Sequence, residues 1–400
     1  MTVPDNVFHI DFTIKMKEIY FDNSATTKPS QRVLDAVIRT MTEDYGNPSS
    51  MHRKGVEAEK YLKEARRTIA ETLRVTDKEI FFTSGGTESN NWALTGAAGA
   101  LKRRGNTILV TEMEHPSVSE PLRFLEKSGF CVKKIPVDSV GHPDEAALEA
   151  MLTEDVILVS AMYVNNEIGA VVPVDRIAAS VHRHCPNALV HVDAVQAYGK
   201  YRIQPRKSGI DLMSVSGHKF HGPKGTGFLY VRNGVRILPL LYGGGQQGGM
   251  RSGTENVPGI AGLAAACREA YEQFEEKTGH MMELRDRLEA GLREMDGVVV
   301  HGGDAETRAP HIVHAAFTGI GSEVLLHTLE DRGIYVSAGS ACSTHKRLAS
   351  PTMTAIAAAK EEAVSSVRFS FSELNTEEEI DRTLEVLREV IPVLRRYRAH

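Results

Sequence analysis

The sequence predicts an α/β fold in which helices flank a mainly parallel sheet. Short apolar runs alternate with helical stretches from about residue 79 to about residue 230. Two of these runs lead to charged residues, Asp193 and Lys219, as expected where parallel strands end at a ligand-binding crevice. The chain has 400 residues, whereas single hydrophobic cores stop growing near ~250–300 residues. We therefore expect two domains.

In the first part of the chain, short apolar runs bounded by polar or turn residues are interpreted as strands. They lie at residues 80–83, 107–111, 130–137, 156–164, 188–193 and 210–216. The expected helices include residues 53–75, 88–101 and 174–184. The last of these is opened by Pro173, which suits a helix start because proline has no amide hydrogen to leave unpaired.

A second, smaller domain is expected towards the C-terminus. A long helical pattern extends from Pro258 to about residue 295. Beyond it we expect strands at residues 298–301 and 310–317 and helices at 322–332 and 376–396. No internal repeat or low-complexity linker is visible, so the domain boundary is expected within the long helical pattern.

The composition argues against several classes of protein. The chain has 47 basic and 52 acidic side chains, a net charge of −5 and no basic block, so no direct role with nucleic acid is expected. The longest apolar runs are far shorter than the ~20 residues of a membrane helix, and the N-terminus is unlike a secretion signal. These features predict a cytoplasmic protein. The four cysteines lack disulfide or zinc-ligand spacing and should be reduced thiols.

Lys219 differs from a typical surface lysine because it follows a buried apolar run. In such a place a lysine can lose part of its preference for the charged state, as an imine-forming amine requires. Asp193 ends a neighbouring run, and Gln196 follows it. This pairing suits pyridoxal 5′-phosphate (PLP), which a lysine carries as a Schiff base while an aspartate keeps its pyridine nitrogen protonated.

Seven short segments carry the most specific information. They are residues 20–27 (YFDNSATT), 46–50 (GNPSS), 83–90 (TSGGTESN), 165–169 (NNEIG), 216–219 (SGHK), 251–254 (RSGT) and 340–343 (SACS). In this order they resemble the PLP-dependent cysteine desulfurases. The resemblance implies fold type I within the class V aminotransferases, with a large domain built on a mainly parallel seven-stranded sheet and a smaller α+β C-terminal domain.

The resemblance also implies how the chain is divided. Residues 1–15 would be an N-terminal extension, for which disorder is one option, and residues 16–28 would pack with the small domain. Residues 29–270 would form the large PLP-binding domain. Residues 271–400 would form the small domain, which carries the loop of the catalytic cysteine.

A phosphate site is expected at the Gly-Gly turn that precedes the second helix. Such a turn can direct backbone N–H groups and a hydroxyl at an anion, although alone it is more often only a turn. The resemblance implies phosphate binding by Gly86 and Thr87, with Ser216 and His218 as further donors. Thr254 resembles the residue that reaches the phosphate of the neighbouring subunit, which implies a homodimer with its active site at the interface.

Four further residues receive roles from the resemblance. His115 would stack on the pyridine ring and move a proton to or from sulfur, which suits a side chain that titrates near neutrality. Asn166 and Gln196 would hydrogen-bond the pyridoxal 3′-oxygen, Asn166 also contacting substrate. Arg368 could bind a substrate carboxylate with its two-pronged donors. Without the family, a loop histidine, buried amides satisfied by backbone and a surface arginine on an edge strand are the alternatives.

Cys342 is the candidate nucleophile. It lies among small residues that favour a mobile, exposed loop, and only its thiolate would attack sulfur. The other cysteines lie in strand-like or helix-like patterns typical of buried thiols: Cys131, Cys185 and Cys267. The segment from Cys342 to Arg368 resembles the long-loop branch of the family, whose flexible arm can carry sulfur between proteins. No resident metal is expected, and contact between Cys342 and a transferred iron–sulfur cluster is left open.

The resemblance implies conversion of L-cysteine to L-alanine. Substrate replaces Lys219 on the cofactor, Arg368 holds its carboxylate, and the freed lysine removes the Cα proton. Cys342 then attacks the substrate sulfur and becomes a persulfide, which passes to an acceptor such as an iron–sulfur scaffold or a tRNA-thiolation or thiamine-pathway protein. Two alternatives are a selenocysteine lyase or PLP aminotransferase, and a non-enzymatic sulfur-delivery or scaffold protein.

One departure from the family pattern lies close to the expected carboxylate site. Ser372 and Glu373 follow the apolar stretch of Arg368 at a place where many relatives have a glycine. The catalytic positions themselves match, so the departure bears on the geometry of this turn.

Overall fold

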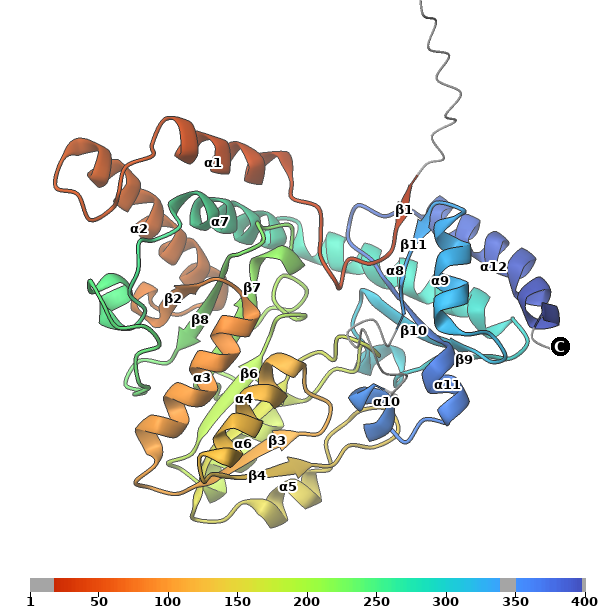
Figure 1. Cartoon of the computed structure of the whole chain (residues 1–400), viewed down its shortest axis with the longest axis horizontal. Coiled ribbons are helices and arrows are strands. Elements are labelled where there is room, and N and C mark those ends of the chain that lie inside the picture. The colour runs from red at the N-terminus through yellow and green to blue at the C-terminus, as the bar shows by residue number, and fades with distance from the viewer. Residues whose placement is uncertain (1–17, 339–349, 398–400) are drawn as a thin grey trace, which may run out of the picture.

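The computed structural model describes residues 18–338 and 350–397. Its larger part is built on a seven-stranded sheet with the order β2-β8-β7-β6-β5-β3-β4. The strand β8 is antiparallel to both of its neighbours, and every other adjacent pair is parallel. The predicted α/β class with a mainly parallel sheet is confirmed (Figure 1).

The strands of this sheet are short and buried, except for one edge. They are β2 (Ile80–Thr83), β3 (Thr107–Thr111), β4 (Cys131–Ile135), β5 (Val156–Met162), β6 (Leu189–Asp193), β7 (Leu212–Ser216) and β8 (Gly227–Val231). Six of them match expected strands, within a few residues at the ends. The seventh, β8, was not identified from the sequence, because a short apolar run does not distinguish a buried strand from a helix by periodicity.

Helices cover both faces of this sheet. On one face lie α3 (Gly86–Leu101) and α4 (Pro116–Lys127), and on the other lie α2 (Arg53–Leu73), α6 (Val174–His184) and α7 (Val257–Tyr271). Within β5, Leu158 packs toward the first group and Val159 toward the second. This burial on both faces explains why the strands read as continuous apolar runs. The remaining helices of this part are α1 (Gln31–Thr42), which packs on α7, and α5 (Glu145–Met151).

The expected long helix beyond Pro258 is two helices, α7 and α8 (Phe274–Arg293). Gln273 separates them with φ 51° and ψ 37°, in the left-handed region. The rings of Tyr271 and Phe274 stack across the break with their centroids 5.4 Å apart. Neither glycine nor proline marks the break in the sequence, and the stacking helps to compensate the cost of about 1–2 kcal/mol for a left-handed non-glycine residue.

A second, antiparallel sheet forms the core of the C-terminal part. Its order is β12-β13-β10-β9, with β9 (Val298–His301), β10 (Ile312–Phe317), β12 (Ser337–Ala338) and β13 (Ser366–Ser370). Apolar residues of α8, α9 (Ser322–Glu330) and α12 (Glu377–Tyr397) pack on it. The other short elements are α10 (Pro351–Ala355), α11 (Lys360–Ser365) and the parallel pair β1 (Ile19–Tyr20) and β11 (Ile334–Tyr335).

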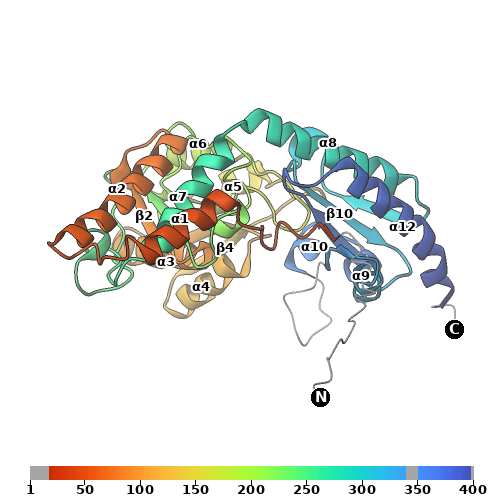
Figure 2. The ribbon, with the colours of Figure 1, turned by 90° about the horizontal axis from the view of Figure 1, so that it is seen from above.

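The first described residues belong to the C-terminal core and then cross to the larger sheet (Figures 1 and 2). Ile19 and Phe21 are buried in the core of the second sheet. From there residues 22–28 run toward the carboxyl end of β7, where Thr27 accepts and donates hydrogen bonds. The expected domain bounds at residues 28 and 270 stay a prediction.

None of the helices among the described residues is both long enough and apolar enough to span a lipid bilayer.

Candidate active site

Lys219 lies at the carboxyl end of β7, in the short 3-10 turn Gly217–Lys219. Its Nζ donates hydrogen bonds to the carbonyl oxygens of Ser24 at 2.7 Å and Ala25 at 2.8 Å. Burial and the charge of Arg368 lower the pKa of Lys219 to about 8, with a smaller contribution from Lys200. A larger fraction of this amine is therefore uncharged near neutrality than for an ordinary lysine, which favours nucleophilic chemistry.

Asp193 ends β6, the strand beside β7, and is 3% exposed. Its Oδ2 accepts a hydrogen bond from Asn90 Nδ2 at 2.7 Å, and its Oδ1 accepts one from the backbone N–H of Val195 at 2.9 Å. Burial raises the pKa of Asp193 above its usual value, and these two hydrogen bonds oppose that shift. The site thus holds a buried carboxyl group that can accept a hydrogen bond from a further donor.

His115 is joined to Asp193 through two polar side chains. Asn90 Nδ2 donates both to Asp193 and, at 2.9 Å, to Ser117 Oγ. The His115 Nδ1 accepts from the Ser117 backbone N–H at 3.1 Å and lies 2.8 Å from Ser117 Oγ. Because Nδ1 is an acceptor here, a neutral ring carries its hydrogen on Nε2. Burial lowers the pKa of His115, which favours this neutral form.

A cavity of about 330 Å³ lies at the N-terminus of α3. The helix start directs unpaired backbone N–H groups toward it. At Gly86 a side chain would not fit, since a Cβ would approach Val195 Cγ2 to 2.6 Å, and Gly85 has φ 146°, which favours glycine. The hydrogen-bonding and charged residues that line the cavity are Thr26, Ser84, Thr87, Glu88, Ser216, His218 and Lys224. Its helix N-terminus and hydroxyl groups form a donor set suited to an anion.

The contacts of Glu88 and His218, two of these lining residues, indicate their charge states. Glu88 is paired with Arg251, whose Nε lies 2.8 Å from Glu88 Oε1, so its negative charge is compensated. Burial lowers the pKa of His218 to about 4, together with the charges of Lys219 and Lys224. Neutral His218 interacts with Thr26 Oγ1 at 3.2 Å through Nδ1.

The structure therefore brings most of the predicted phosphate ligands together, with one exception. Gly86, Thr87, Ser216 and His218 all line this cavity. Thr254 is exposed and does not line it. Thr254 therefore does not contact the phosphate cavity of its own chain.

Arg368 is buried in the middle of the second sheet, where β13 lies between β12 and β10. The alternative of a surface arginine on an edge strand is therefore wrong. Its Nη1 donates to the carbonyl oxygen of Asn166 at 2.7 Å, and its Nη2 pairs with Asp22 Oδ1 at 2.9 Å. Its Nε is buried and has no partner among the described residues. These contacts use one N–H on each Nη, so the second N–H of each remains for an anion such as a carboxylate.

The two predicted amide ligands differ in how they are held. Gln196 is buried, donates from Nε2 to the Ser24 carbonyl at 3.0 Å and lies 3.4 Å from His311 Nε2 through Oε1. These contacts also fit a buried amide with a backbone partner, so its contact with a cofactor stays a prediction. Asn166 is half-buried and contributes its backbone carbonyl to Arg368, and the role of its side chain also stays a prediction.

The cysteines follow the expected pattern only in part. Cys342 lies outside the described residues. Cys185 and Cys267 are buried as expected, and burial raises the pKa of Cys267 to about 12. The expectation that Cys131 is buried is wrong. It is exposed, because β4 is the edge strand of the sheet and only Ile135 within it is buried.

Several residues that build the site were not identified from the sequence. Asn90 and Asp22 lie inside recognised segments, but their spacing gives no sign that they contact Asp193 and Arg368. Ser117 and Lys200 carry no sequence signal of this kind. Their contacts depend on how the helices and loops pack at the ends of β6 and β7.

The chain is similar in sequence to one family of proteins over most of its length. Residues 19–383 match the profile of the aminotransferase class-V family. The chain is 41% identical over 379 residues to the cysteine desulfurase IscS of Methanosarcina thermophila, covering 95% of this chain and 93% of the relative. It is 41% identical over 377 residues to the cysteine desulfurase IscS of Clostridium botulinum strain Hall, covering 94% of each.

Solved structures give the same picture. A NifS-like protein superimposes with a TM-score of 0.89 at 41% identity, covering 94% of this chain and 100% of that one. A cysteine desulfurase from Thermococcus onnurineus NA1 superimposes with a TM-score of 0.85 at 27% identity, covering 94% of this chain and 95% of that one.

Proposed function

The chain belongs to the class-V aminotransferase family and is a cysteine desulfurase, and from this premise we propose that it uses PLP at Lys219. It converts L-cysteine to L-alanine and passes the sulfur to Cys342 as a persulfide. The proposal rests most on one observation: Lys219, the buried carboxyl of Asp193 and an anion cavity lie together at the carboxyl end of the sheet.

The residues present fit PLP. The N-terminus of α3, with Gly86, Thr87 and Ser216, provides hydrogen-bond donors to a phosphate group and leaves space for it. Asp193 would pair with the pyridine nitrogen, and Lys219 would carry the aldehyde carbon. When bound, PLP supplies a carbon that condenses with amines and a protonated ring that accepts an electron pair from the substrate Cα.

Lys219 then acts as the base for the Cα proton. Its pKa of about 8 gives it a substantial neutral fraction near neutral pH. The carbonyl oxygens of Ser24 and Ala25 already accept hydrogen bonds from its Nζ, so they stabilise the ammonium once the proton has been taken.

His115 holds the proton needed at sulfur. Ser117 engages its Nδ1, which leaves Nε2 to exchange a proton with the substrate thiol. The substrate carboxylate binds at Arg368, where the remaining N–H groups of Nη1 and Nη2 provide donors and the contacts with Asp22 and Asn166 fix the guanidinium plane.

Sulfur transfer requires the thiolate of Cys342. It attacks the substrate sulfur, so that a sulfur–sulfur bond forms while the carbon–sulfur bond breaks and its electron pair returns to Cβ. Protonation of Cβ, return of the proton from Lys219 to Cα and release of the amino group from the cofactor yield L-alanine. The persulfide passes to an acceptor protein such as an iron–sulfur scaffold or a tRNA-thiolation enzyme.

A homodimer completes the proposal. On α1 the apolar residues Leu34, Ile38 and Met41 are exposed at helical spacing, and Tyr242 is also 80% exposed. An exposed apolar stripe of this kind along one helix is typical of an interface. Thr254, which is also exposed, would reach the phosphate site of the partner.

The test is alanine formation from L-cysteine by the PLP-loaded protein, with Cys342→Ser as the comparison. Wild type should release alanine and carry a persulfide on Cys342, and the variant should retain the cofactor and form neither product. A fully active variant, or a catalytic persulfide on Cys131, Cys185 or Cys267, would contradict the proposal.

A further inference from the structure

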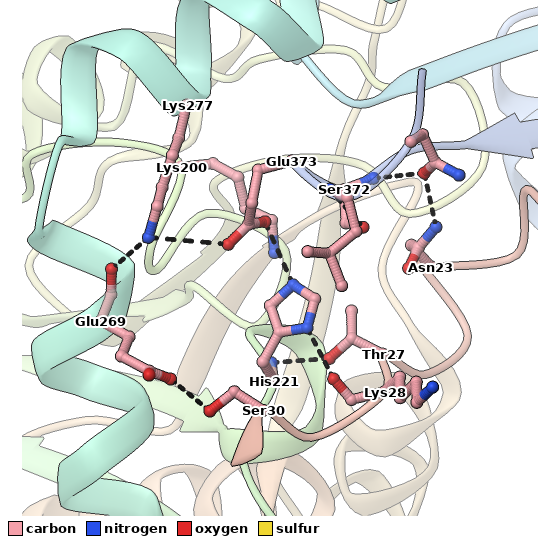
Figure 3. A network of polar contacts seen from close by, with 12 residues as sticks. Asn23, Thr27, Lys28, Ser30, Lys200, His221, Glu269, Lys277, Ser372 and Glu373 are labelled. Atoms are coloured by element: carbon pink, nitrogen blue, oxygen red, sulfur yellow. Dashed lines mark hydrogen bonds and ion pairs between the residues drawn. The ribbon is translucent and has the colours of Figure 1, made fainter. Parts of the chain in front are cut away.

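Glu373, at the departure from the family pattern, is a half-buried carboxylate that faces the larger sheet from the turn after β13. Its Oε2 lies 3.1 Å from His221 Nε2, and its Oε1 lies 3.8 Å from Lys277 Nζ (Figure 3). Burial acts to raise the pKa of Glu373, but the hydrogen bond and charge of His221, with the charge of Lys277, outweigh it and bring the pKa to about 2. The side chain is therefore ionised at working pH.

His221 anchors this carboxylate to the segment that follows Lys219. Its Nδ1 lies 2.7 Å from the carbonyl oxygen of Lys28, and its backbone N–H donates to Thr27 Oγ1 at 2.6 Å. Both ring nitrogens thus face acceptors, Lys28 oxygen on one side and Glu373 on the other. The ring therefore bridges the Lys28 backbone and the Glu373 carboxylate.

Lys200 holds the backbone of Lys219, and Glu373 acts on Lys200 through its charge. Its Nζ donates to the backbone carbonyl of Lys219 at 2.5 Å. Burial lowers the pKa of Lys200 to about 8, and the charge of Glu373 opposes that shift. Glu373 thus supports the charged form of the side chain that holds the backbone of Lys219.

Hydrogen bonds also join the Glu373 turn to the strand that carries Arg368. The neighbouring Ser372 N–H donates to Asn375 Oδ1 at 2.9 Å, and Asn23 Nδ2 donates to the same oxygen at 3.2 Å (Figure 3). Asn23 Nδ2 also donates to the carbonyl of Ser370, at the end of the strand that carries Arg368. The contacts of Glu373 therefore join the two halves of the site.

We propose that Glu373 is a positioning residue: through its contact with His221 it holds the turn after β13, and with it Arg368, in a fixed place relative to Lys219. This inference rests on the proposed function, which assigns Arg368 to the substrate carboxylate and Lys219 to the Cα proton. We expect Arg368 and Lys219 to keep their own hydrogen bonds when Glu373 is changed, because those bonds do not involve Glu373. Removing the Glu373 charge should therefore weaken substrate binding between the two halves of the site more than it slows the chemical step.

The test is Glu373→Gln, which keeps the size of the side chain and removes its charge. Loss of a charge-assisted contact should raise KM for L-cysteine by about tenfold, while kcat stays within about threefold. The Kd of L-alanine, read from the absorbance change of the PLP-loaded protein, should rise in parallel. Cofactor affinity should not change, because Glu373 does not line the phosphate cavity.

The control is Glu330→Gln, which removes a Glu–His pair at the surface, between Glu330 Oε2 and His327 Nδ1 at 3.0 Å on α9. It should leave both constants unchanged. His221→Asn removes the Glu373 contact from the opposite side, tolerates the left-handed φ of 66° and should give the same rise in KM. The double variant should be no worse than either single variant.

The outcomes separate the two claims. Suppose that the wild-type protein turns over cysteine, but both Glu373→Gln and His221→Asn leave KM and the Kd of alanine unchanged. That result would overturn the positioning role alone, even if the melting temperature of the variants fell. No cysteine turnover by wild type would overturn the proposed function.

Discussion

Substitution of Asn90 tests directly how the site stabilises the ionised form of Asp193. Substitution by leucine keeps the size of this fully buried side chain and removes both of its hydrogen bonds. A bond to a charged group contributes about 1.5–3 kcal/mol and a neutral one about 0.5–1.5 kcal/mol. Asn90 Oδ1, however, is buried without a partner among the described residues, and its removal returns about 1 kcal/mol or more. We expect a net loss of about 1–3 kcal/mol.

The loss should depend on pH with a defined sign. Asn90 stabilises the ionised form of Asp193, so without it burial raises the pKa of Asp193 further. Asn90→Leu should thus lose more stability near pH 8 than at a pH low enough to protonate Asp193 in both proteins. Urea unfolding of the cofactor-free protein at several pH values measures this, and the Kd of PLP should rise together with the loss.

The control is the next residue. Asn91 Nδ2 donates to the carbonyl oxygen of Thr87 at 2.9 Å near the protein surface, so Asn91→Ala should change the free energy of unfolding by less than about 0.5 kcal/mol. If Asn90→Leu also changed it by less than that, or lost the same amount at every pH, the assigned link between Asn90 and Asp193 would be refuted.

Two further predictions concern the cofactor. Asp193→Ala should weaken PLP binding and slow proton abstraction severely, since an unprotonated pyridine is a poor electron sink, and near-wild-type turnover would refute that role. The rate at which PLP attaches to the cofactor-free protein should rise with pH and level off above about 8, because the neutral amine of Lys219 is the reactive form. A rate that kept rising toward pH 10, the range of an ordinary lysine, would contradict the lowered pKa.

Much of the fold could be predicted from the sequence because local patterns carry it. The strands β2 and β3 match their expected bounds, since both are apolar runs between clear polar or turn signals. The break at Gln273 could not be predicted, because it depends on the stacking of Tyr271 on Phe274. The exposure of Cys131 depends on β4 being an edge strand, which is a property of the whole sheet.

The candidate site divides in a similar way. Lys219 and Asp193 could be proposed from their places after apolar runs, and the phosphate loop from its glycines together with the family resemblance. The contacts that tune them could not, because Asn90 meets Asp193 across 103 positions of the chain, and Asp22 meets Arg368 across 346. Such pairs follow only once strands and helices have been placed in space.

The most direct test of the site is to locate the cofactor on the chain. Protein loaded with PLP, reduced with borohydride and digested, should yield one modified peptide with the reduced cofactor on Lys219, and Lys219→Ala should yield none. Lys224, which lines the same cavity, is the nearest competitor. Attachment to Lys224 in the wild-type protein would contradict the account.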